Sequence, residues 1–314
     1  MTVQSAILDD TACPGLARSC VLRAETIGCR APRQWQSGRV VAVFACACYV
    51  AIDGGGLLAI LTRDAGLVAH GIRLESRPRL DTRLHAGLHV RCDGNRISFA
   101  GKDAAIDVSR AKIWQPKLQS GVFDRSPRAR QSLACAEELL AGAAARSDSE
   151  FLKAVLQIAV PPSAFSDLIS VRLLSLAAAQ QARDSAATLK AIGGLIGLGP
   201  GLTPAGDDFV IGFIAGLTLS AESAEARRFR QEMCEGVAAL RHATTMISAQ
   251  HLDDACHLCF SERLTNLCDA IGRGRSEADL QSQIAAQLSV GATSGADAAS
   301  GLIFALSAVA ACDR

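Results

Sequence analysis

Lysine is scarce in this sequence, and no long run of one charge occurs. Five of the 32 basic residues are lysine, and the 314-residue chain has a net charge of +1. A protein whose main partner is nucleic acid normally concentrates basic residues on one face, so the composition argues against that class. The scarcity of lysine also limits phosphate loops of the Walker type, which require a lysine after their last glycine.

Long apolar runs are missing too. Glycine and charged residues interrupt the apolar stretches well short of the length that spans a membrane. The chain also shows no basic start followed by an apolar export segment. Several of the 12 cysteines, such as Cys46, Cys48 and Cys135, lie inside apolar runs and should act as small hydrophobic residues. We therefore expect a reduced, cytoplasmic protein with no membrane or nucleic-acid partner.

The first ~120 residues show the periodicity of strands. Two β-rich stretches, 40–44 and 46–52, precede a turn at Asp53-Gly54-Gly55-Gly56, and 57–61 returns, which predicts a hairpin. Alternating apolar and polar residues at 88–92 and 96–100 predict a second hairpin. Further strands are expected at 6–8, at 20–27 (strand or short helix), and at 106–108 and 111–114 as edge strands.

The character of the sequence changes between Pro116 and Pro127. Ser126 can cap a helix that has Pro127 in its first turn, and dense alanine beyond it favours helix. Further helices are predicted at 149–159, 163–191, 208–220, 223–241, 246–272 (interrupted), 277–289 and 296–311. The sequence therefore predicts an α+β protein, with a mainly β domain at 1–122 and an all-α domain at 123–314.

A glycine-rich loop organises the helical half. Residues 193–208 contain six glycines and two prolines, which are costly in a regular helix or strand. The run 209–219 that follows is apolar on every face and predicts a buried helix. The loop thus brings Asp207 and Asp208 to the start of a core helix, where carboxylates need partners or a use.

A similar spacing recurs near the end of the chain. Residues 201–207 and 291–297 share the pattern G-x-T-x3-D, and each precedes an apolar helix. Glycine-rich turns at helix N-termini offer unpaired amides at the positive end of the helix dipole, so they can bind carboxylate or phosphate. Asp207 and Asp208 then serve either as helix caps or as ligands of a hydrated Mg²⁺ that bridges to a phosphate.

A third polar segment covers residues 241–251. Thr244, Ser248 and His251 are spaced to lie on one face of a helix. Two interpretations stay open for this segment: a solvated helix start with threonine caps, or the lining of a site near the glycine loops.

Familiar site motifs do not fit the chain. The glycines at 197, 199 and 201 differ in spacing from the dinucleotide fingerprint, and their flanks predict helix. Cys256, His257 and Cys259 lack a second ligand pair at structural-zinc spacing, so we interpret them as ordinary helix residues.

The histidines of the β half receive a structural interpretation. His70, His85 and His89 lie among the predicted strands, and we expect them to decorate those strands.

Three motifs together resemble the AllH-like family. They are Gly197-Leu-Gly-Pro-Gly-Leu-Thr-Pro-Ala-Gly-Asp-Asp208, Thr244-Thr-x-Ile-Ser248 and Ser294-Gly-x-Asp-x3-Gly301. The resemblance covers most of the chain and is vaguest in the β half. The family commonly has serine where this sequence has Ala205, so a hydroxyl role at that position does not carry over.

The resemblance implies a function in purine and allantoin breakdown, as a subunit of oxamate carbamoyltransferase. That enzyme transfers a carbamoyl group between oxalurate and phosphate, giving oxamate and carbamoyl phosphate. It contains several different subunits, so other protein chains are expected as partners, beside a small anionic substrate such as phosphate, carbamoyl phosphate or an oxalurate-like molecule. Carbamoyl transfer requires fixed donors for a phosphate and for charge on a carbonyl oxygen.

We predict that the three motifs converge on one pocket. The expected catalytic residues are Asp207, Asp208 and Asp297, and the expected substrate- or anion-binding residues are Gly199, Gly201, Thr203, Gly206, Thr244, Thr245, Ser248, Ser294 and Gly295. The sequence assigns no cofactor with certainty, and Mg²⁺ is the candidate. A non-catalytic scaffold subunit and a Mg-dependent enzyme that uses a nucleotide or phosphate are the competing functions.

Overall fold

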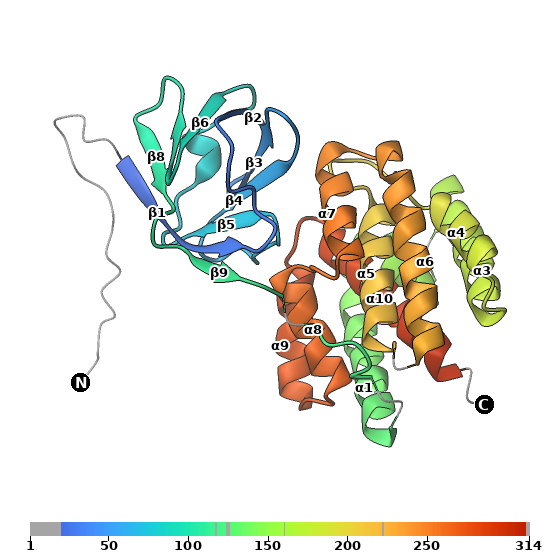
Figure 1. Cartoon of the computed structure of the whole chain (residues 1–314). Coiled ribbons are helices and arrows are strands. Elements are labelled where there is room, and N and C mark those ends of the chain that lie inside the picture. Colours follow the sequence, from blue (N-terminus) through green and yellow to red (C-terminus); the bar gives the residue numbers. More distant parts are fainter. Residues whose placement is uncertain (1–19, 117, 124–125, 160, 222, 312–314) are drawn as a thin grey trace, which may run out of the picture.

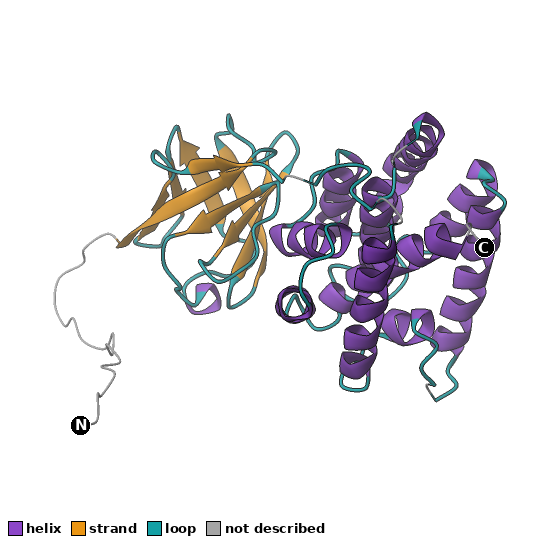
Figure 2. Cartoon of the chain, turned by 90° about the horizontal axis from the view of Figure 1, so that it is seen from below, coloured by secondary structure: helices purple, strands orange, loops and turns teal. Residues whose placement is uncertain are grey.

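The computed structural model describes residues 20–311 except 117, 124–125, 160 and 222. A β region comes first along the chain and a helical region follows it (Figure 1). Viewed from below, the strands gather at one end of the molecule and the longer helices at the other (Figure 2). The predicted α+β class is therefore confirmed. The possible strand at 6–8 lies outside the described residues.

The strands of the described part form one nine-stranded sheet in the order β5-β4-β3-β2-β6-β7-β8-β1-β9, and an additional β5–β1 pairing closes it. Their bounds are β1 Cys20–Gly28, β2 Ser37–Val43, β3 Ala47–Ile52, β4 Leu57–Leu61, β5 Gly71–Leu74, β6 His89–Asp93, β7 Arg96–Phe99, β8 Ala104–Asp107 and β9 Lys112–Trp114, with a short 3-10 turn at Leu80–Thr82. Inward side chains of most strands fill a shared apolar core that includes Val50, Ile60, Ile72 and Val90.

Both predicted hairpins are present. Strands β3 and β4 pair antiparallel with Ala51 opposite Leu57, and β6 and β7 pair with Asp93 opposite Arg96. The expectation of two edge strands is wrong for β8, which lies between β7 and β1. The sequence of a short strand does not indicate which strands it pairs with. Here the parallel partner β1 lies more than 80 residues earlier in the chain than β8.

Helices occupy the rest of the described chain. They are α1 Pro127–Ala144, α2 Glu150–Val155, α3 Ala164–Gln181, α4 Ser185–Gly193, α5 Ala205–Leu219, α6 Ala224–Leu240, α7 Met246–Cys256, α8 Glu262–Gly272, α9 Glu277–Leu288 and α10 Ser294–Ala311, with a 3-10 turn at Arg241–Ala243. Ser126 caps α1 as predicted and accepts from the amide of Ala129 at 3.2 Å.

The single helix predicted at 163–191 is wrong. Arg183 adopts a φ of 52°, and Asp184 caps the new helix α4 by accepting from the amide of Ala187 at 2.9 Å. The left-handed residue ends α3, and the aspartate supplies the acceptor that a helix start needs. The break expected within 246–272 is confirmed, since Leu258 with a φ of 60° separates α7 from α8.

Helices α5 and α10 form the core of the helical region (Figure 1). A Cβ placed on Gly212 would come within 1.8 Å of the Ala298 carbonyl oxygen, and one on Gly301 within 1.9 Å of the Phe209 carbonyl oxygen. Glycine therefore permits backbone-to-backbone contact between the two helices. Gly212 lies against Ala298 and Leu302, and Gly216, one turn later, lies against Leu302 and Ala305. The contacts advance along both helices together, so the helices are parallel and start at the same end.

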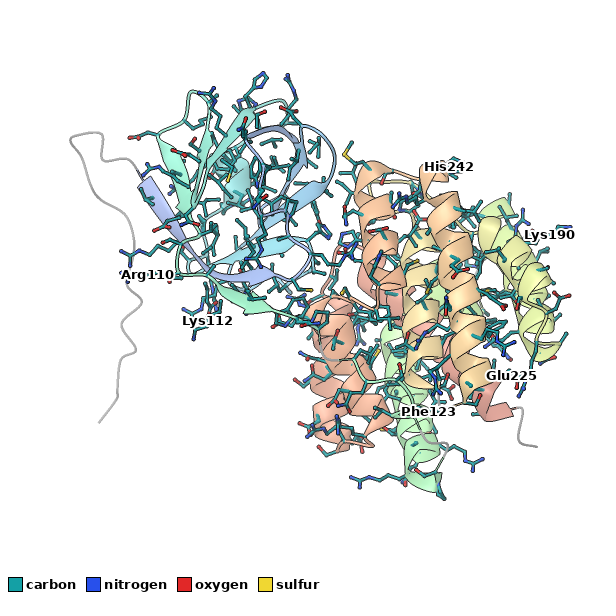
Figure 3. All side chains as sticks on the ribbon, in the orientation of Figure 1. Arg110, Lys112, Phe123, Lys190, Glu225 and His242 are labelled. Carbon is teal, nitrogen blue, oxygen red and sulfur yellow. The ribbon has the colours of Figure 1, made fainter. Side chains whose placement is uncertain are left out.

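The boundary between the two regions falls after β9. Phe123 is fully buried in the helical core, and its amide donates to the Leu219 carbonyl at 3.0 Å. In Figure 3 Phe123 lies against the helices, whereas Arg110 and Lys112 lie on the β region and Lys190 lies on α4 at the far side. The exact division at 122 stays a prediction.

The two regions contact each other along α7 and the start of α8. Ile247 packs with Ala42, Leu57 and Tyr49 of the β region, and Glu262 accepts from the Arg73 guanidinium at 2.7 Å. None of the helices among the described residues is long and apolar enough to cross a membrane.

Candidate functional site

The glycine-rich loop turns tightly between α4 and α5. Gly197 and Gly201 have φ angles of 76° and 97°, which side-chain-bearing residues rarely adopt. The amide of Gly206 donates to the Leu198 carbonyl at 2.9 Å and thereby joins the loop to the first turn of α5. The predicted loop therefore leads directly into the core helix, with both aspartates in its first turn.

Asp207 holds this loop to α7. Its carboxylate is fully buried and accepts from the Gly197 amide at 2.8 Å, from the Ser248 hydroxyl at 2.6 Å, and from the Thr244 hydroxyl. Three donors satisfy a buried carboxylate well. The hydroxyl protons of Thr244 and Ser248 are therefore engaged in hydrogen bonds to Asp207. These three residues hold the glycine-rich loop against the start of α7.

Two further contacts bring the three predicted segments together. The hydroxyls of Thr203 and Ser294 lie 2.9 Å apart, which joins the loop before α5 to the start of α10. Thr245 caps α7 by accepting from the Ser248 amide at 3.1 Å, and its hydroxyl donates to the Leu202 carbonyl at 2.5 Å. The structure therefore places the N-terminal ends of α5, α7 and α10 side by side.

Asp208 is held quite differently from its neighbour. It is only 8% exposed, and its Oδ2 atom has no hydrogen-bond partner among the described residues. Burial, together with Asp297 and Asp207 nearby, raises the pKa of Asp208 well above its usual value, against the opposing effect of hydroxyls of Ser294 and Thr203. The raised pKa favours a protonated carboxyl, which can donate a hydrogen bond.

Asp297 lies in the first turn of α10 and is fully buried. It accepts from the Ser149 hydroxyl at 2.5 Å, while its Oδ2 atom has no partner among the described residues. Burial raises the pKa of Asp297 to about 6, although hydrogen bonds from Ser149 and Thr293 act in the opposite direction. Two neighbouring helix starts therefore carry carboxyls with incomplete hydrogen bonding.

The predicted backbone donors divide into two groups. Within the described residues, the amides of Gly199 and Gly201 donate to no protein acceptor. The Gly295 amide, by contrast, donates to the Val290 carbonyl at 3.0 Å, and a Cβ there would meet the Gln287 carbonyl oxygen at 1.9 Å. The geometry gives Gly206 and Gly295 a packing role and leaves Gly199 and Gly201 as available donors.

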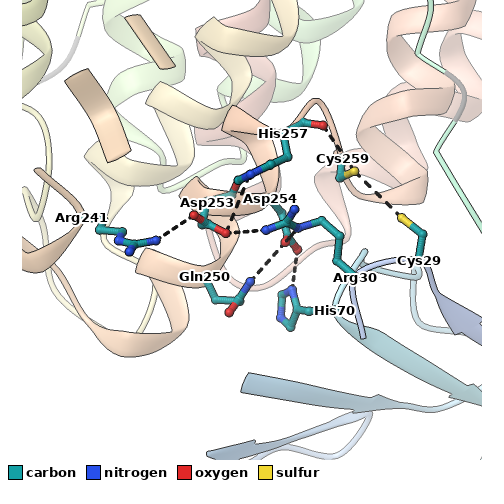
Figure 4. A network of polar contacts seen from close by, with 9 residues as sticks. All are labelled: Cys29, Arg30, His70, Arg241, Gln250, Asp253, Asp254, His257 and Cys259. Carbon is teal, nitrogen blue, oxygen red and sulfur yellow. Dashed lines mark hydrogen bonds and ion pairs between the residues drawn. The ribbon is translucent and has the colours of Figure 1, made fainter. Parts of the chain in front are cut away.

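Sequence reasoning missed a polar network at the junction of the two regions (Figure 4). His70 Nδ1 lies 2.6 Å from Asp254 Oδ2, and Arg30 Nε donates to Asp254 Oδ1 at 2.7 Å. These partners, with His70 and Arg30 donating, lower the pKa of Asp254 although burial acts to raise it. The expectation that His70 decorates a strand is wrong, since the residue is fully buried against α7. Its apolar neighbours in the sequence were the available signal.

The cysteines of the junction are free thiols. The Sγ atoms of Cys29 and Cys259 lie 3.9 Å apart (Figure 4), and neither forms a disulfide. Within the described part of the chain, no three His, Cys, Asp or Glu side chains gather in an arrangement that could hold a metal ion.

The comparison with protein families concerns the same part of the chain. Residues 195–306 match the family model for oxamate carbamoyltransferase subunit AllH. The match begins in the glycine loop and ends within α10, so it includes all three motifs that indicated the resemblance. No curated protein and no solved structure matches the chain.

Proposed function

We propose that this protein is the anion-binding subunit of a carbamoyltransferase that converts oxalurate and phosphate into oxamate and carbamoyl phosphate. The convergence of the starts of α5, α7 and α10 around Asp208 supports this proposal most directly. The AllH family description supports the same enzyme, and the word subunit in that description favours further protein partners.

Parallel packing of α5 and α10 favours negative charge at their shared start. Side-by-side parallel helices place two positive dipole ends together, which is unfavourable unless anions or carboxylates lie nearby. The buried carboxyl of Asp207, with its three donors, lies at this shared start. The amides of Gly199 and Gly201 and the hydroxyl of Thr203 are placed to receive an external anion.

The raised pKa of Asp208 removes an electrostatic conflict. An ionised carboxylate would repel an incoming phosphate at the same helix end. A protonated carboxyl instead offers an O–H to the ligand, as fixed donors do for developing oxyanions. In the proposed reaction a phosphate oxygen bonds to the carbamoyl carbon, the bond from that carbon to the departing amide nitrogen breaks, and the proton of Asp208 moves to that nitrogen. The phosphate hydroxyl proton restores the carboxyl.

The alternative of a Mg-dependent enzyme fits the residues poorly. The carboxyl oxygens of Asp207 already accept hydrogen bonds from three protein donors. A protonated Asp208 is a weak cation ligand. The scaffold alternative explains Gly212 and Gly301, which serve helix packing, but gives no reason for an unpartnered carboxyl oxygen in the core.

Binding of inorganic phosphate to the full chain tests the proposal. Isothermal titration and hydrogen exchange should show binding together with protection of the amides at 197–203. Thr203→Val and Asp208→Ala should each weaken binding about tenfold, the usual effect of one lost hydrogen bond to a charged group. Asp208→Asn should retain most of the affinity, because its amide is uncharged and can still donate.

Asp167→Ala provides a matched control, because Asp167 also lies in the first turn of a helix but is exposed. This variant should bind phosphate as the unaltered protein does. Absence of phosphate binding, or binding that Thr203→Val and Asp208→Ala leave unchanged, would refute the proposed site.

A further inference from the structure

A set of aromatic side chains lies where the β region meets α7. The ring of His251 on α7 contacts Tyr49 of β3 edge-on, with centroids 6.4 Å apart. The same ring contacts His70, with centroids 4.8 Å apart. His251 retains some exposed surface, whereas His70 is fully buried. The three rings therefore run from the protein interior to a surface that solvent can reach.

The innermost ring, that of His70, is fixed by a hydrogen bond to Asp254. Asp254 accepts from His70 Nδ1 and from Arg30, so the orientation of the His70 ring is set. The Nε2 atom of His70 then has no hydrogen-bond partner among the described residues, although it is buried. Buried polar atoms without partners are rare in native proteins, and they often mark a place where a ligand or water binds.

The outermost ring is that of Tyr49, which packs against Ile247 at the start of α7. Burial raises the pKa of Tyr49 to about 12. On α7, Ser248 lies one turn before His251 and donates to Asp207 at 2.6 Å. Tyr49 packs against Ile247, the residue before Ser248, and His251 contacts the Tyr49 ring, so both lie beside the candidate site on the side of the β region.

The electrostatic state of His251 limits what it can recognise. Burial and the neighbouring His70 lower the pKa of His251 to about 3, although Asp254 acts to raise it. A neutral imidazole presents one N–H donor and one lone pair. The Tyr49 hydroxyl likewise stays protonated and can both donate and accept.

We infer that Tyr49 and His251 recognise a neutral amide or ureide group of the ligand, and that His70 and Asp254 position the His251 ring. This inference rests on the proposed function, because it assumes that the anionic end of the same ligand binds at the glycine loop. An amide offers N–H donors and a carbonyl acceptor, which match neutral groups that both donate and accept. A carboxylate offers acceptors alone, and it would leave the lone pair of His251 unpaired.

Competition between oxamate, a monoanion, and oxalate, a dianion, tests the inference on the full chain. In oxamate an amide replaces one carboxylate of oxalate, which also removes one negative charge, so the change of the affinity ratio in the variants is the decisive reading. The unaltered protein should bind oxamate at least tenfold more tightly than oxalate, because a site built to pair a substrate N–H rejects an analogue that lacks it. Tyr49→Phe and His251→Gln should each reduce this ratio severalfold while leaving inorganic phosphate binding unchanged.

His85→Gln is the matched control, because His85 is an exposed histidine whose contact is a neighbouring backbone carbonyl. It should leave the oxamate-to-oxalate ratio unchanged. Tyr49→Phe removes one hydroxyl and keeps the ring packing, so it remains informative if His251→Gln fails to fold.

Nitrogen NMR of the histidine rings tests the positioning residues. Oxamate should shift the ring signals of His251, and Asp254→Asn should alter the tautomer signals of His70 and reduce the oxamate shift at His251. If phosphate binds but the ratio is insensitive to Tyr49→Phe and His251→Gln, this inference is wrong and the proposed function stands. If phosphate does not bind but the ratio depends on His251, the proposed function fails and the amide site remains.

Discussion

The starts of α5 and α10 share a sequence pattern but differ in how their aspartates are held. Asp207 accepts three hydrogen bonds, all from outside its own helix. Asp297 occupies the equivalent position and accepts from the Ser149 side chain, with its other oxygen unpartnered within the described residues. The helices lie parallel and start side by side, joined by Thr203 and Ser294.

The difference separates a fully hydrogen-bonded carboxyl from carboxyls with incomplete hydrogen bonding within one motif. A carboxylate with several donors is stabilised in its ionised form and holds its neighbours in place. A buried carboxyl that keeps one oxygen without a partner is pushed toward its protonated form. Asp207 therefore builds the loop, while Asp208 and Asp297 retain the capacity to exchange a proton.

The largest expected effect comes from removing the carboxylate of Asp207. Asp207→Ala leaves one amide and two hydroxyls without their acceptor, and it should lower the free energy of unfolding by about 3–5 kcal/mol. Urea denaturation followed by circular dichroism measures the change. Asp208→Ala is the control from the adjacent position, and its cost should be much smaller because the Asp208 carboxyl is poorly paired. Equal costs at both positions would contradict the distinction.

The second prediction concerns the pH dependence of stability. The pKa of Asp297 is raised from 3.8 to about 6 in the folded protein. The folded state therefore binds the proton more tightly than the unfolded chain, and the resulting stability is present below pH 4 and is lost as the pH rises to about 6. A shift of about two pKa units corresponds to roughly 3 kcal/mol at most.

Asp297→Asn should remove this contribution, since asparagine does not titrate and its oxygen can still accept from Ser149. The variant should match the unaltered protein near pH 4 and exceed its unfolding free energy by about 2–3 kcal/mol at pH 7. Asp297 contributes to the raised pKa of Asp208, so removing its charge also relieves Asp208 and adds to the difference at pH 7 in the same direction. A gap that is the same at pH 4 and pH 7 would show that the carboxyl is not responsible.

Local sequence patterns predicted those features that depend on neighbours in the chain. Turn glycines between apolar runs indicated the β3–β4 hairpin, and the glycine loop before an apolar run indicated the start of α5. The succession of a β region and a helical region followed from the periodicity of the apolar residues. The break between α3 and α4 at Arg183 was not predicted, because nothing in the sequence around it indicates a left-handed residue.

The roles of the polar residues depended on distant contacts. The partners of Asp207 lie 10, 37 and 41 residues away, and Asp254 reaches His70 across 184 residues. No short window contains both members of such a pair, so the sequence indicated polar side chains near the loop without saying which are satisfied. The protonation preference of Asp208 likewise depends on burial that only the fold creates.

The smallest expected effects lie at the first glycine of each repeated pattern. Gly201 has a φ of 97° and Gly291 a φ of 59°. The second value lies in the left-handed helical region, which asparagine enters at modest cost, whereas the first lies outside it. Gly291→Asn should therefore cost about 0.5–1 kcal/mol, and Gly201→Asn about 1–2 kcal/mol. Nothing lies within 4 Å of a Cβ at Gly201, so its cost reports backbone strain alone, whereas a Cβ at Gly291 also approaches Ser294. Urea midpoints at constant slope measure both, and a larger cost at Gly291 would mean that crowding near Ser294 outweighs backbone strain at the start of α10.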